Sequence, residues 1–348
     1  MNIILTCNAG STNTKLAVFD AQTLELKAYT TTHTITEITA WLLAVALLGN
    51  VTDIGHRVVH GGRNLTQPTR ITPQVLDTIK SYTPLVPLHQ PATISLIEEM
   101  QKIYPNVPHI ACFDTAFHHT MPDIHRRFAL PQSYYDEGIM RYGFHGLSYE
   151  YISQTMPNHE KVIVVHLGGG ASACAMHNRK SVASTMGFST LDGLMMGTRC
   201  GTVDAGILLY LLQEKNMTPT ALTNLLYHQS GLKGVSGISG NMQDLLASQD
   251  PKAHQAITLF CMMAAKEISG LIPALGGLDA LIFTGGIGEN APEIRNKIAA
   301  LLHWLGDIKI YTIPTNEALM MAQACQKQNN PPKTKETARW ENEGGNIN

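Results

Sequence analysis

The fold is decided by two stretches that share one design: ILTCNAGSTNTKLAVFD, residues Ile4–Asp20, and VIVVHLGGGASACAMHN, residues Val162–Asn178. Each stretch predicts a strand of apolar and β-branched residues, a turn of glycine and small polar residues, and a second strand. The copies lie roughly 160 residues apart, which is the spacing of an internal duplication of whole domains. We therefore expect a fold with two related halves, against the alternative of two unrelated hairpins.

Further strands are predicted outward from these copies, rich in Val, Ile and Thr and bounded by glycine or polar residues. Helical patterns lie between the strands, as at Ala92–Ile103. Strands that alternate with helices indicate an α/β protein. The predicted strands are Asn2–Cys7, Lys15–Asp20, Ile54–His60, His109–Asp114, Lys161–Leu167, Ala171–His177, Leu278–Thr284 and Lys309–Pro314.

Composition narrows the class of protein. A chain of 348 residues is too long for one ordinary core, so two domains are expected. Hydrophobic residues make up 44% and charged residues 15%, which is typical of a globular protein with a large interior. The net charge of −2, with no long basic run, argues against nucleic acid or a membrane surface as partner. The six cysteines show no C-x-x-C pair or zinc spacing, which indicates reduced, buried thiols and a cytoplasmic location.

Three segments bear on location and order. The apolar stretch Leu259–Leu275 is interrupted by two charged residues and a proline, so it predicts a core helix, or an interface helix, rather than a membrane span. Residues Met1–Leu5 show no basic region, and no secretory signal is predicted. From Gln326 onward the chain is polar, and residues 329–348 are predicted to form a disordered tail.

Three glycine-rich turns follow apolar strands, at Asn8–Thr12, His166–Gly170 and Thr284–Asn290. Glycine has no Cβ, so the backbone N–H groups of such turns can approach a phosphate closely. None of the turns has the G-x-x-x-x-G-K-[ST] pattern of a P-loop, and the third lacks the spacing of a Rossmann turn. One such turn is most often structural, but three of them after strands indicate nucleotide binding.

Four charged or polar residues carry the remaining chemistry. Arg57 shares one strand face with Val59, since side chains alternate along a strand. Asp114 ends an apolar strand, where ligands bind in α/β sheets. His145 and Arg199 each stand in a glycine-bordered segment. Any one of these is more often a surface ion pair or a buried structural residue, but together they form the inventory that phosphoryl transfer needs.

These motifs together resemble the acetate kinase family, within the superfamily of sugar kinases, actin and the heat-shock chaperone ATPases. The resemblance runs from Met1 to about Ala322 and implies two related ribonuclease-H-like domains, a duplicated βββαβαβα core, with the active site in the cleft between them. It implies domains at 1–146 and 147–316, with a C-terminal helix at 317–328 that joins the first domain. The motifs, in the family's order, are CNAGSTNTK, GHRVVHGG, FDTAFHHTMP, RYGFHGLS, HLGGGAS, MGTRCGTVD, FTGGIGEN and IPTNE.

The resemblance also implies an activity, the reversible phosphorylation of acetate by Mg-ATP, giving acetyl phosphate and ADP by direct in-line transfer. The implied cofactors are ATP/ADP and Mg²⁺, with Mn²⁺ as a substitute, and the implied assembly is a homodimer. Propionate or butyrate kinase stays open, because one methylene in an apolar pocket discriminates by only about 1–3 kcal/mol. A catalytically weak nucleotide-binding relative is the alternative from another class.

Roles for individual residues follow from the same resemblance. The implied catalytic residues are Arg57, Asp114, His145 and Arg199, and the substrate contacts are Arg57, Val59, Leu88 and Phe144. The implied metal ligands are Asn8 and Glu317. The implied nucleotide contacts are Lys15, His166, Leu167, Gly168, Gly169, Gly170, Asn241, Met242, Gln243, Gly286, Ile287, Gly288, Glu289 and Asn290. A carboxylate is already ionised at neutral pH, so Asp114 is interpreted as an orienting or metal-linked group rather than a base.

The chain departs from the family pattern at a few positions. Asn13 stands in place of a hydroxyl residue and Gly169 in place of an asparagine. The nucleoside segment, usually an acid, a hydrophobe and an arginine, is Asn241–Gln243, so contacts to ribose and base are expected to change. Thr190 replaces a pocket proline and Tyr149 a histidine. The chain is also shorter than most members, in regions where peripheral segments would lie.

Overall fold

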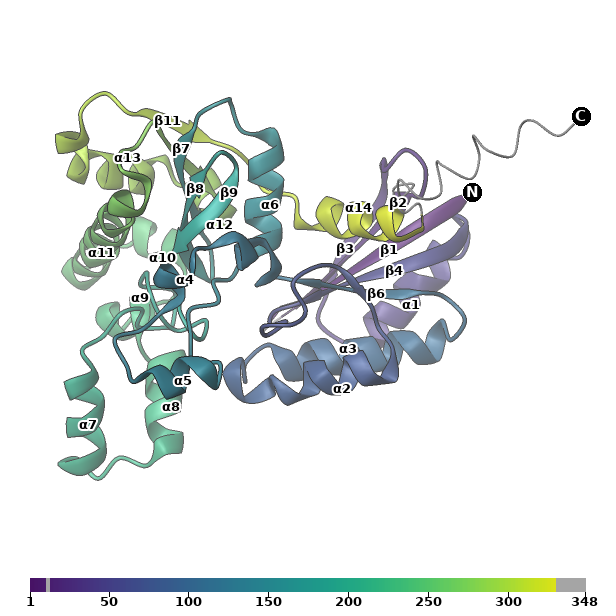
Figure 1. Ribbon diagram of the computed structural model, residues 1–348, viewed down its shortest axis with the longest axis horizontal. Helices are drawn as coiled ribbons and strands as arrows, with labels where there is room; N and C mark the ends of the chain where they lie inside the picture. The colour runs from purple at the N-terminus through teal and green to yellow at the C-terminus, as the bar shows by residue number, and fades with distance from the viewer. Residues whose placement is uncertain (11–12, 330–348) are drawn as a thin grey trace, which may run out of the picture.

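The computed structural model describes residues 1–10 and 13–329. Their strands form two sheets, and Figure 1 shows each sheet with its helices as a separate lobe. Ser11 and Thr12 of the first glycine turn lie outside the described residues, as does the predicted tail beyond Asn329.

The first sheet has six strands in the order β3-β2-β1-β4-β6-β5. β1 pairs with β2 and β2 with β3 in antiparallel fashion, whereas β1–β4 and β4–β6 are parallel. β1 is buried along most of its length, which explains its continuous apolar sequence. The strands are β1 (Asn2–Ala9), β2 (Thr14–Asp20), β3 (Leu26–Thr32), β4 (Asn50–Val58), β5 (Thr69–Arg70) and β6 (His109–Phe113).

The second sheet repeats this plan in the order β11-β10-β7-β8-β9. β7–β8 and β8–β9 are antiparallel, while β7–β10 and β10–β11 are parallel. β7, β8, β9, β10 and β11 therefore correspond to β1, β2, β3, β4 and β6, which confirms the prediction of two related halves. The strands are β7 (Lys161–Leu167), β8 (Ala171–His177), β9 (Lys180–Ser184), β10 (Ala280–Thr284) and β11 (Lys309–Thr312).

Helices cover the first sheet on both faces. α1 (Ile35–Val45) begins with a capping box formed by Thr34 and Glu37, and packs with α3 (Gln90–Ile103) over one face. α14 (Glu317–Asn329), the last helix among the described residues, covers the other face. α6 (Gly146–Thr155) contacts α14 and also packs against β7, so it stands between the two sheets.

The second lobe is built around α11 (Pro251–Leu275), which packs on β8, β9 and β7. By length and composition it is the one helix of the described residues that could cross a membrane, yet its buried residues recur at helical spacing and join the core of the second sheet. The apolar stretch predicted as a core helix therefore packs as one. The remaining helices are α2 (Pro73–Ser81), α4 (Asp123–Arg126), α5 (Gln132–Asp136), α7 (Ala205–Gln213), α8 (Pro219–His228), α9 (Gly231–Ser236), α10 (Met242–Ala247), α12 (Gly285–Asn290) and α13 (Pro292–Leu301), with 3-10 turns η1 (Thr83–Leu85), η2 (Ala116–Thr120) and η3 (His303–Leu305).

The segment after β6 contacts the second sheet before the chain enters it. His118 Nδ1 lies 2.8 Å from Ser181 Oγ, and Thr120 Oγ1 donates to the Ser181 carbonyl at 2.8 Å. The chain then returns to the first sheet at its end, because α14 packs on β1 and β4. The domain limits at residues 146 and 316 stay predictions.

Candidate functional site

The predicted charged residues meet at one edge of the first sheet. Arg57 is near the end of β4 and Asp114 directly follows β6, which pairs in parallel with β4. Asn8 is near the end of β1, on the other side of β4. Because parallel strands end at the same edge, these side chains are brought together from positions far apart in the sequence.

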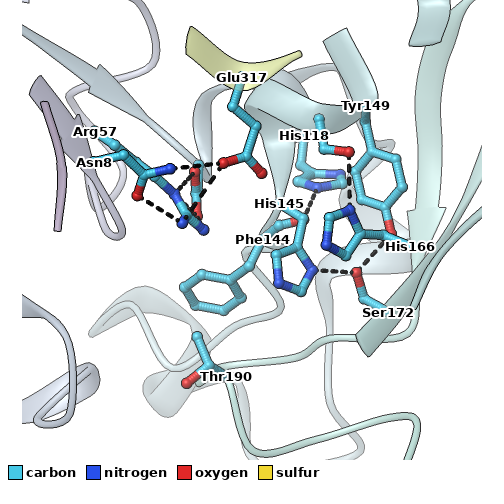
Figure 2. A network of polar contacts seen from close by, with 12 residues as sticks. Asn8, Arg57, His118, Phe144, His145, Tyr149, His166, Ser172, Thr190 and Glu317 are labelled. Atoms are coloured by element: carbon cyan, nitrogen blue, oxygen red, sulfur yellow. Dashed lines mark hydrogen bonds and ion pairs between the residues drawn. The ribbon is translucent and has the colours of Figure 1, made fainter. Parts of the chain in front are cut away.

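Arg57 is the centre of this cluster. Its Nε donates to Asp114 Oδ1 at 3.0 Å and its Nη2 to Oδ2 at 2.6 Å, a two-pronged contact that fixes both planes. Its Nη1 donates to Asn8 Oδ1 at 3.1 Å and lies 3.7 Å from Glu317 Oε2. Asn8 Nδ2 donates to the same Glu317 oxygen at 3.0 Å, as Figure 2 shows. We call Asn8, Arg57, Asp114 and Glu317 the arginine cluster.

Burial and charge oppose each other in the arginine cluster. Burial raises the pKa of Asp114, and the Arg57 guanidinium works against that shift. For Glu317 burial also favours a higher pKa, but Arg57, His166, Lys15 and the Asn8 amide together lower it below its ordinary value. With both carboxylates ionised, one cation faces two anions, which leaves the cluster able to accept a further positive charge.

A pair of stacked histidines lies across from the arginine cluster (Figure 2). The rings of His145 and His166 have centroids 4.4 Å apart and planes 16° from parallel. His145 has a left-handed backbone with φ of 58°. Its glycine neighbours are required, because a Cβ on Gly146 would lie 2.1 Å from the Asp114 carbonyl and one on Gly143 would lie 2.6 Å from the His118 ring. The glycine-bordered histidine predicted from the sequence thus has a steric cause.

Arg199 converges with His145 at the turn between β7 and β8. A Cβ on Gly170 would lie 3.0 Å from both Arg199 Nη2 and His145 Nε2. Arg199 Nη1 donates to the Thr190 carbonyl at 2.6 Å. Burial lowers the pKa of Arg199 to about 10, so the guanidinium is still charged at neutral pH. An anion placed at this turn would meet an arginine and an imidazole together.

The two predicted phosphate loops of the second half lie next to each other. The Gly168 N–H donates to the Gly170 carbonyl at 2.9 Å, which closes the first loop, and a Cβ on Gly168 would lie 3.8 Å from the Gly286 nitrogen. Added Cβ atoms on Gly169 and Gly286 would meet open space. Both loops therefore present backbone that a phosphate could approach.

Side chains at the end of the second loop hold its shape. Glu289 Oε1 accepts from the Gly285 N–H at 2.9 Å and from the Thr315 N–H at 3.0 Å. Asn290 Nδ2 donates to the Gly286 carbonyl at 2.8 Å. Glu289 and Asn290 thus stabilise the loop itself. Leu167 is fully buried and Ile287 packs partly against the same core, while Gly288 is buried in α12.

The predicted nucleoside segment begins α10. Asn241 caps this helix, its Oδ1 accepting from the Gln243 N–H at 2.9 Å. Asn241 and Gln243 are exposed, whereas Met242 is buried in the core of the second sheet. Gly240 and Gly197 are in close backbone contact, and a Cβ on Gly197 would also approach the Gly169 carbonyl. The segment therefore lies beside the glycine loop His166–Gly170.

The remaining predicted contacts are dispersed around the arginine cluster. Val59 and Phe144 are buried in one apolar core, and Leu88 is half-buried just before α3. Lys15 is exposed on β2, near enough for its charge to act on Glu317 and His166. The contacts of all these residues with substrate or nucleotide stay predictions.

Three residues of the site were missed by sequence reasoning. His89 is half-buried, and its partial burial together with the charges of Arg199 and Arg57 lowers its pKa to about 3. Ser172 Oγ lies 2.8 Å from His145 Nδ1, and Ser148 Oγ lies 2.9 Å from His166 Nδ1. Ser172 and Ser148 both belong to motifs quoted above, so the motifs could have pointed to them. His89 has no comparable signal.

The duplicated sheets and the charged junction between them define a class: two-lobed α/β proteins whose lobes meet at a site suited to anions. Residues 22–310 match the sequence model of the acetokinase family. The chain belongs to this family.

Individual relatives agree with that assignment. The acetate kinase of Rhodopseudomonas palustris (strain ATCC BAA-98 / CGA009) is 50% identical over 299 residues, 78% of this chain and 75% of the relative. The acetate kinase of Methylocella silvestris is 44% identical over 312 residues, 82% of this chain and 77% of the relative. Among solved structures, a propionate kinase from Francisella tularensis has a TM-score of 0.87 at 34% identity, covering 94% of this chain and all of that one. The acetate kinase of Porphyromonas gingivalis has a TM-score of 0.82 at 27% identity, covering 94% of this chain and 99% of that one.

Proposed function

We propose that this chain is an acetate kinase, which transfers a phosphoryl group reversibly between ATP and acetate. The observation that carries the proposal is the placement of the arginine cluster opposite His145 and Arg199, with two open glycine loops beside them. The identities of 44–50% to named acetate kinases support the same activity.

The proposed mechanism needs little covalent chemistry from the protein. The carboxylate of acetate is ionised at neutral pH, so its oxygen can attack the γ-phosphorus without a base. That attack forms an O–P bond, the bond to the β-phosphate oxygen breaks, and ADP leaves with its electron pair. Arg57 would hold the acceptor carboxylate, while His145 and Arg199 would offset charge on the transferring group. Asp114 would orient Arg57, since it receives three of its hydrogen bonds.

The oxygen atoms of the arginine cluster fit Mg²⁺. This ion prefers oxygen ligands and is usually held by one or two carboxylates, waters and substrate phosphates, without a closed protein cage. Among residues 1–10 and 13–329, no group of three His, Cys, Asp or Glu side chains forms such a cage. Asn8 and Glu317 would hold the ion, and Mn²⁺ could replace it. When bound, the ion would neutralise charge on the phosphates of ATP.

Propionate kinase is the second candidate. The propionate kinase of Francisella tularensis resembles this chain closely in fold, and Thr190 stands at a position where the family pattern has a pocket proline. The proposed pocket of Val59, Leu88 and Phe144 would set the acyl length through a methylene effect of about 1–3 kcal/mol. We prefer acetate because two acetate kinases of Rhodopseudomonas palustris are 50% and 49% identical to this chain, whereas the propionate kinase is 34% identical.

We further propose a cytoplasmic homodimer with the domain limits given above. α7 has no buried residue, and its Ile207, Leu209 and Tyr210 are exposed, as are Leu259 and Met262 on α11. Exposed apolar side chains gathered on one element are typical of an interface. Light scattering after size exclusion would give twice the chain mass, and Leu209→Glu would reduce it to that of one chain.

Trapping acetyl phosphate as its hydroxamate tests the activity. With Mg-ATP, acetate is expected to give product with higher kcat/KM than propionate or butyrate. Arg199→Ala is expected to lower kcat by about 10³–10⁵ while nucleotide Kd changes little. A preference for a longer acid would overturn the acetate assignment. Folded protein that binds ATP but forms no acyl phosphate from any of the three acids would support the nucleotide-binding relative.

A further inference from the structure

A chain of hydrogen bonds leads from Tyr149 to His145. Tyr149 is on the first turn of α6 and is fully buried, and its hydroxyl lies 2.5 Å from Ser172 Oγ. Ser172, on β8, is also fully buried, and its Oγ lies 2.8 Å from His145 Nδ1. Figure 2 shows the three side chains in this order. The connection runs from α6 through β8 of the second sheet to His145, the residue that directly precedes α6.

The direction of each bond follows from counting protons. Burial raises the pKa of Tyr149 well above its ordinary value, so the phenol keeps its proton, and its oxygen receives the His166 backbone N–H. The Tyr149 proton is therefore free to be donated to Ser172. Among the described residues Ser172 Oγ has hydrogen bonds to Tyr149 and His145. Its own proton must go to His145 Nδ1, since a buried donor without a partner costs about 1–3 kcal/mol.

The consequence for His145 is one tautomer. When Nδ1 accepts a hydrogen bond, the ring proton sits on Nε2, the nitrogen beside Arg199 Nη2 at Gly170. Burial, with the nearby charges of Arg57 and Arg199, lowers the pKa of His145 well below its ordinary value, so the ring is neutral. His145 then offers a hydrogen bond at the turn, and Arg199 supplies the charge.

We propose that Tyr149 and Ser172 are positioning residues that hold His145 as the neutral Nε2–H donor for the transferring phosphoryl group. The role in transfer rests on the proposed function, whereas the tautomer can be measured without activity. His166 offers an internal contrast, since its Nδ1 contacts Ser148 alone among the described residues and no tyrosine fixes the direction of that bond.

The experiment compares Tyr149→Phe, Ser172→Ala and Tyr149→His by proton–nitrogen NMR of ¹⁵N-histidine protein. A His145→Gln spectrum assigns the His145 signals. Wild type is expected to show the Nε2–H form of His145, and both Tyr149→Phe and Ser172→Ala are expected to show a mixture of tautomers. Ser148→Ala is the matched control and should leave His145 in the Nε2–H form. Melting curves establish that each variant is folded, and Ser172→Ala keeps the test open if Tyr149→Phe does not fold.

Kinetics give the second readout. Tyr149→Phe is expected to lower kcat about 10- to 100-fold with ATP KM changed less than threefold, because the donor is lost from the transition state. On the acid side of the pH–rate profile, the kcat of Tyr149→Phe is expected to begin to fall at a higher pH than the kcat of wild type. Tyr149→His, whose imidazole can donate to Ser172, should recover much of the rate. An unchanged tautomer with kcat within twofold of wild type would overturn the proposal. If wild type proved inactive with every acid, the proposed function would fail. The NMR measurement of the His145 tautomer would still test whether Tyr149 and Ser172 position that ring.

Discussion

Equivalent strands of the two sheets end in different chemistry. In the first sheet charged or amide side chains lie at or directly after the ends of β1, β4 and β6, namely Asn8, Arg57 and Asp114. In the second, the corresponding β7 and β10 run into glycine loops in which Gly169 and Gly286 present exposed backbone. One edge thus offers side chains and the other offers main chain, although the strand order is the same.

The two copies of the duplicated fold therefore have different binding roles. Side-chain charges can be matched to one small acceptor and a metal, whereas backbone N–H groups suit any phosphate. The topology places both edges at the junction of the lobes, and the residues after each strand decide what the edge binds.

Removing the Arg57 guanidinium should abolish most of the function of the side chains at the edge of the first sheet. Arg57→Ala is expected to lower kcat/KM for acetate by about 10³–10⁵, while nucleotide Kd changes less than about threefold. It also leaves Asp114 buried without its partner, so the free energy of unfolding should fall by about 3–5 kcal/mol. Steady-state rates, ATP titration and urea unfolding measure the three effects. Arg63→Ala removes an exposed arginine of the same half and is the control. A variant that keeps a tenth of the wild-type kcat/KM would contradict this role.

Acid should weaken the junction through its buried histidines. Burial lowers the pKa of His60 to about 4, of His89 to about 3 and of His118 to about 4. Their folded pKa values lie below the unfolded value of 6.5, so the unfolded chain binds more protons and stability falls as the pH drops below 6.5. Three protons correspond to up to about 4 kcal/mol per pH unit.

Urea unfolding at pH 7, 6 and 5 measures that slope. His118→Gln is expected to reduce the slope by up to about 1.4 kcal/mol per pH unit, since one proton no longer binds on unfolding. His254→Gln, at an exposed position on α11, should leave the slope unchanged. A stability that is flat from pH 7 to 5 would show that the histidines are not held neutral.

Two neighbouring glycines test whether the main chain of the first loop in the second sheet must be approached closely. Gly170→Ala is expected to lower kcat about 10- to 100-fold, because the new methyl would crowd Arg199 and His145 at 3.0 Å. Gly169→Ala should change kcat less than threefold, because its methyl would enter open space. Steady-state rates of the pair make the test internally matched. Equal losses in both variants would mean that the loop acts through its flexibility rather than through close approach.

The smallest effect is expected at the nucleoside end. Gln243 is exposed and stands where the family pattern has arginine. Gln243→Arg is expected to lower the ATP KM between about two- and tenfold, the value of one added hydrogen bond, with kcat unchanged. Gln243→Ala is the control and should change neither constant by more than about twofold. A higher ATP KM in the arginine variant would place the nucleoside elsewhere.

Much of the fold could be predicted because buried strands are runs of apolar and β-branched residues that stand out in the sequence. Every predicted strand overlaps one in the structure, and the repeated strand–turn–strand units identified the duplication. β3 was missed because it lies at a sheet edge with mostly exposed side chains, among them Lys27. β9, also an edge strand, is short and contains two serines, so neither its composition nor its length stood out.

The site was only partly predictable from residues alone. Arg57 and Asp114 were found because strand ends are informative, and the family resemblance supplied the roles of Asn8 and Glu317. The contact between Tyr149 and Ser172 could not be foreseen, because it depends on how α6 packs against β8. Two residues that meet only through tertiary packing have no characteristic spacing in the sequence.

Glu317 joins the arginine cluster from the start of α14, 309 residues after its partner Asn8. During synthesis the first sheet leaves the ribosome long before α14, so one face of that sheet emerges uncovered. The carboxylate that completes the cluster is made only after all the strands of the second sheet. A nascent chain can therefore hold the strands of both sheets and still lack one member of the cluster, so the site is complete only once α14 has docked.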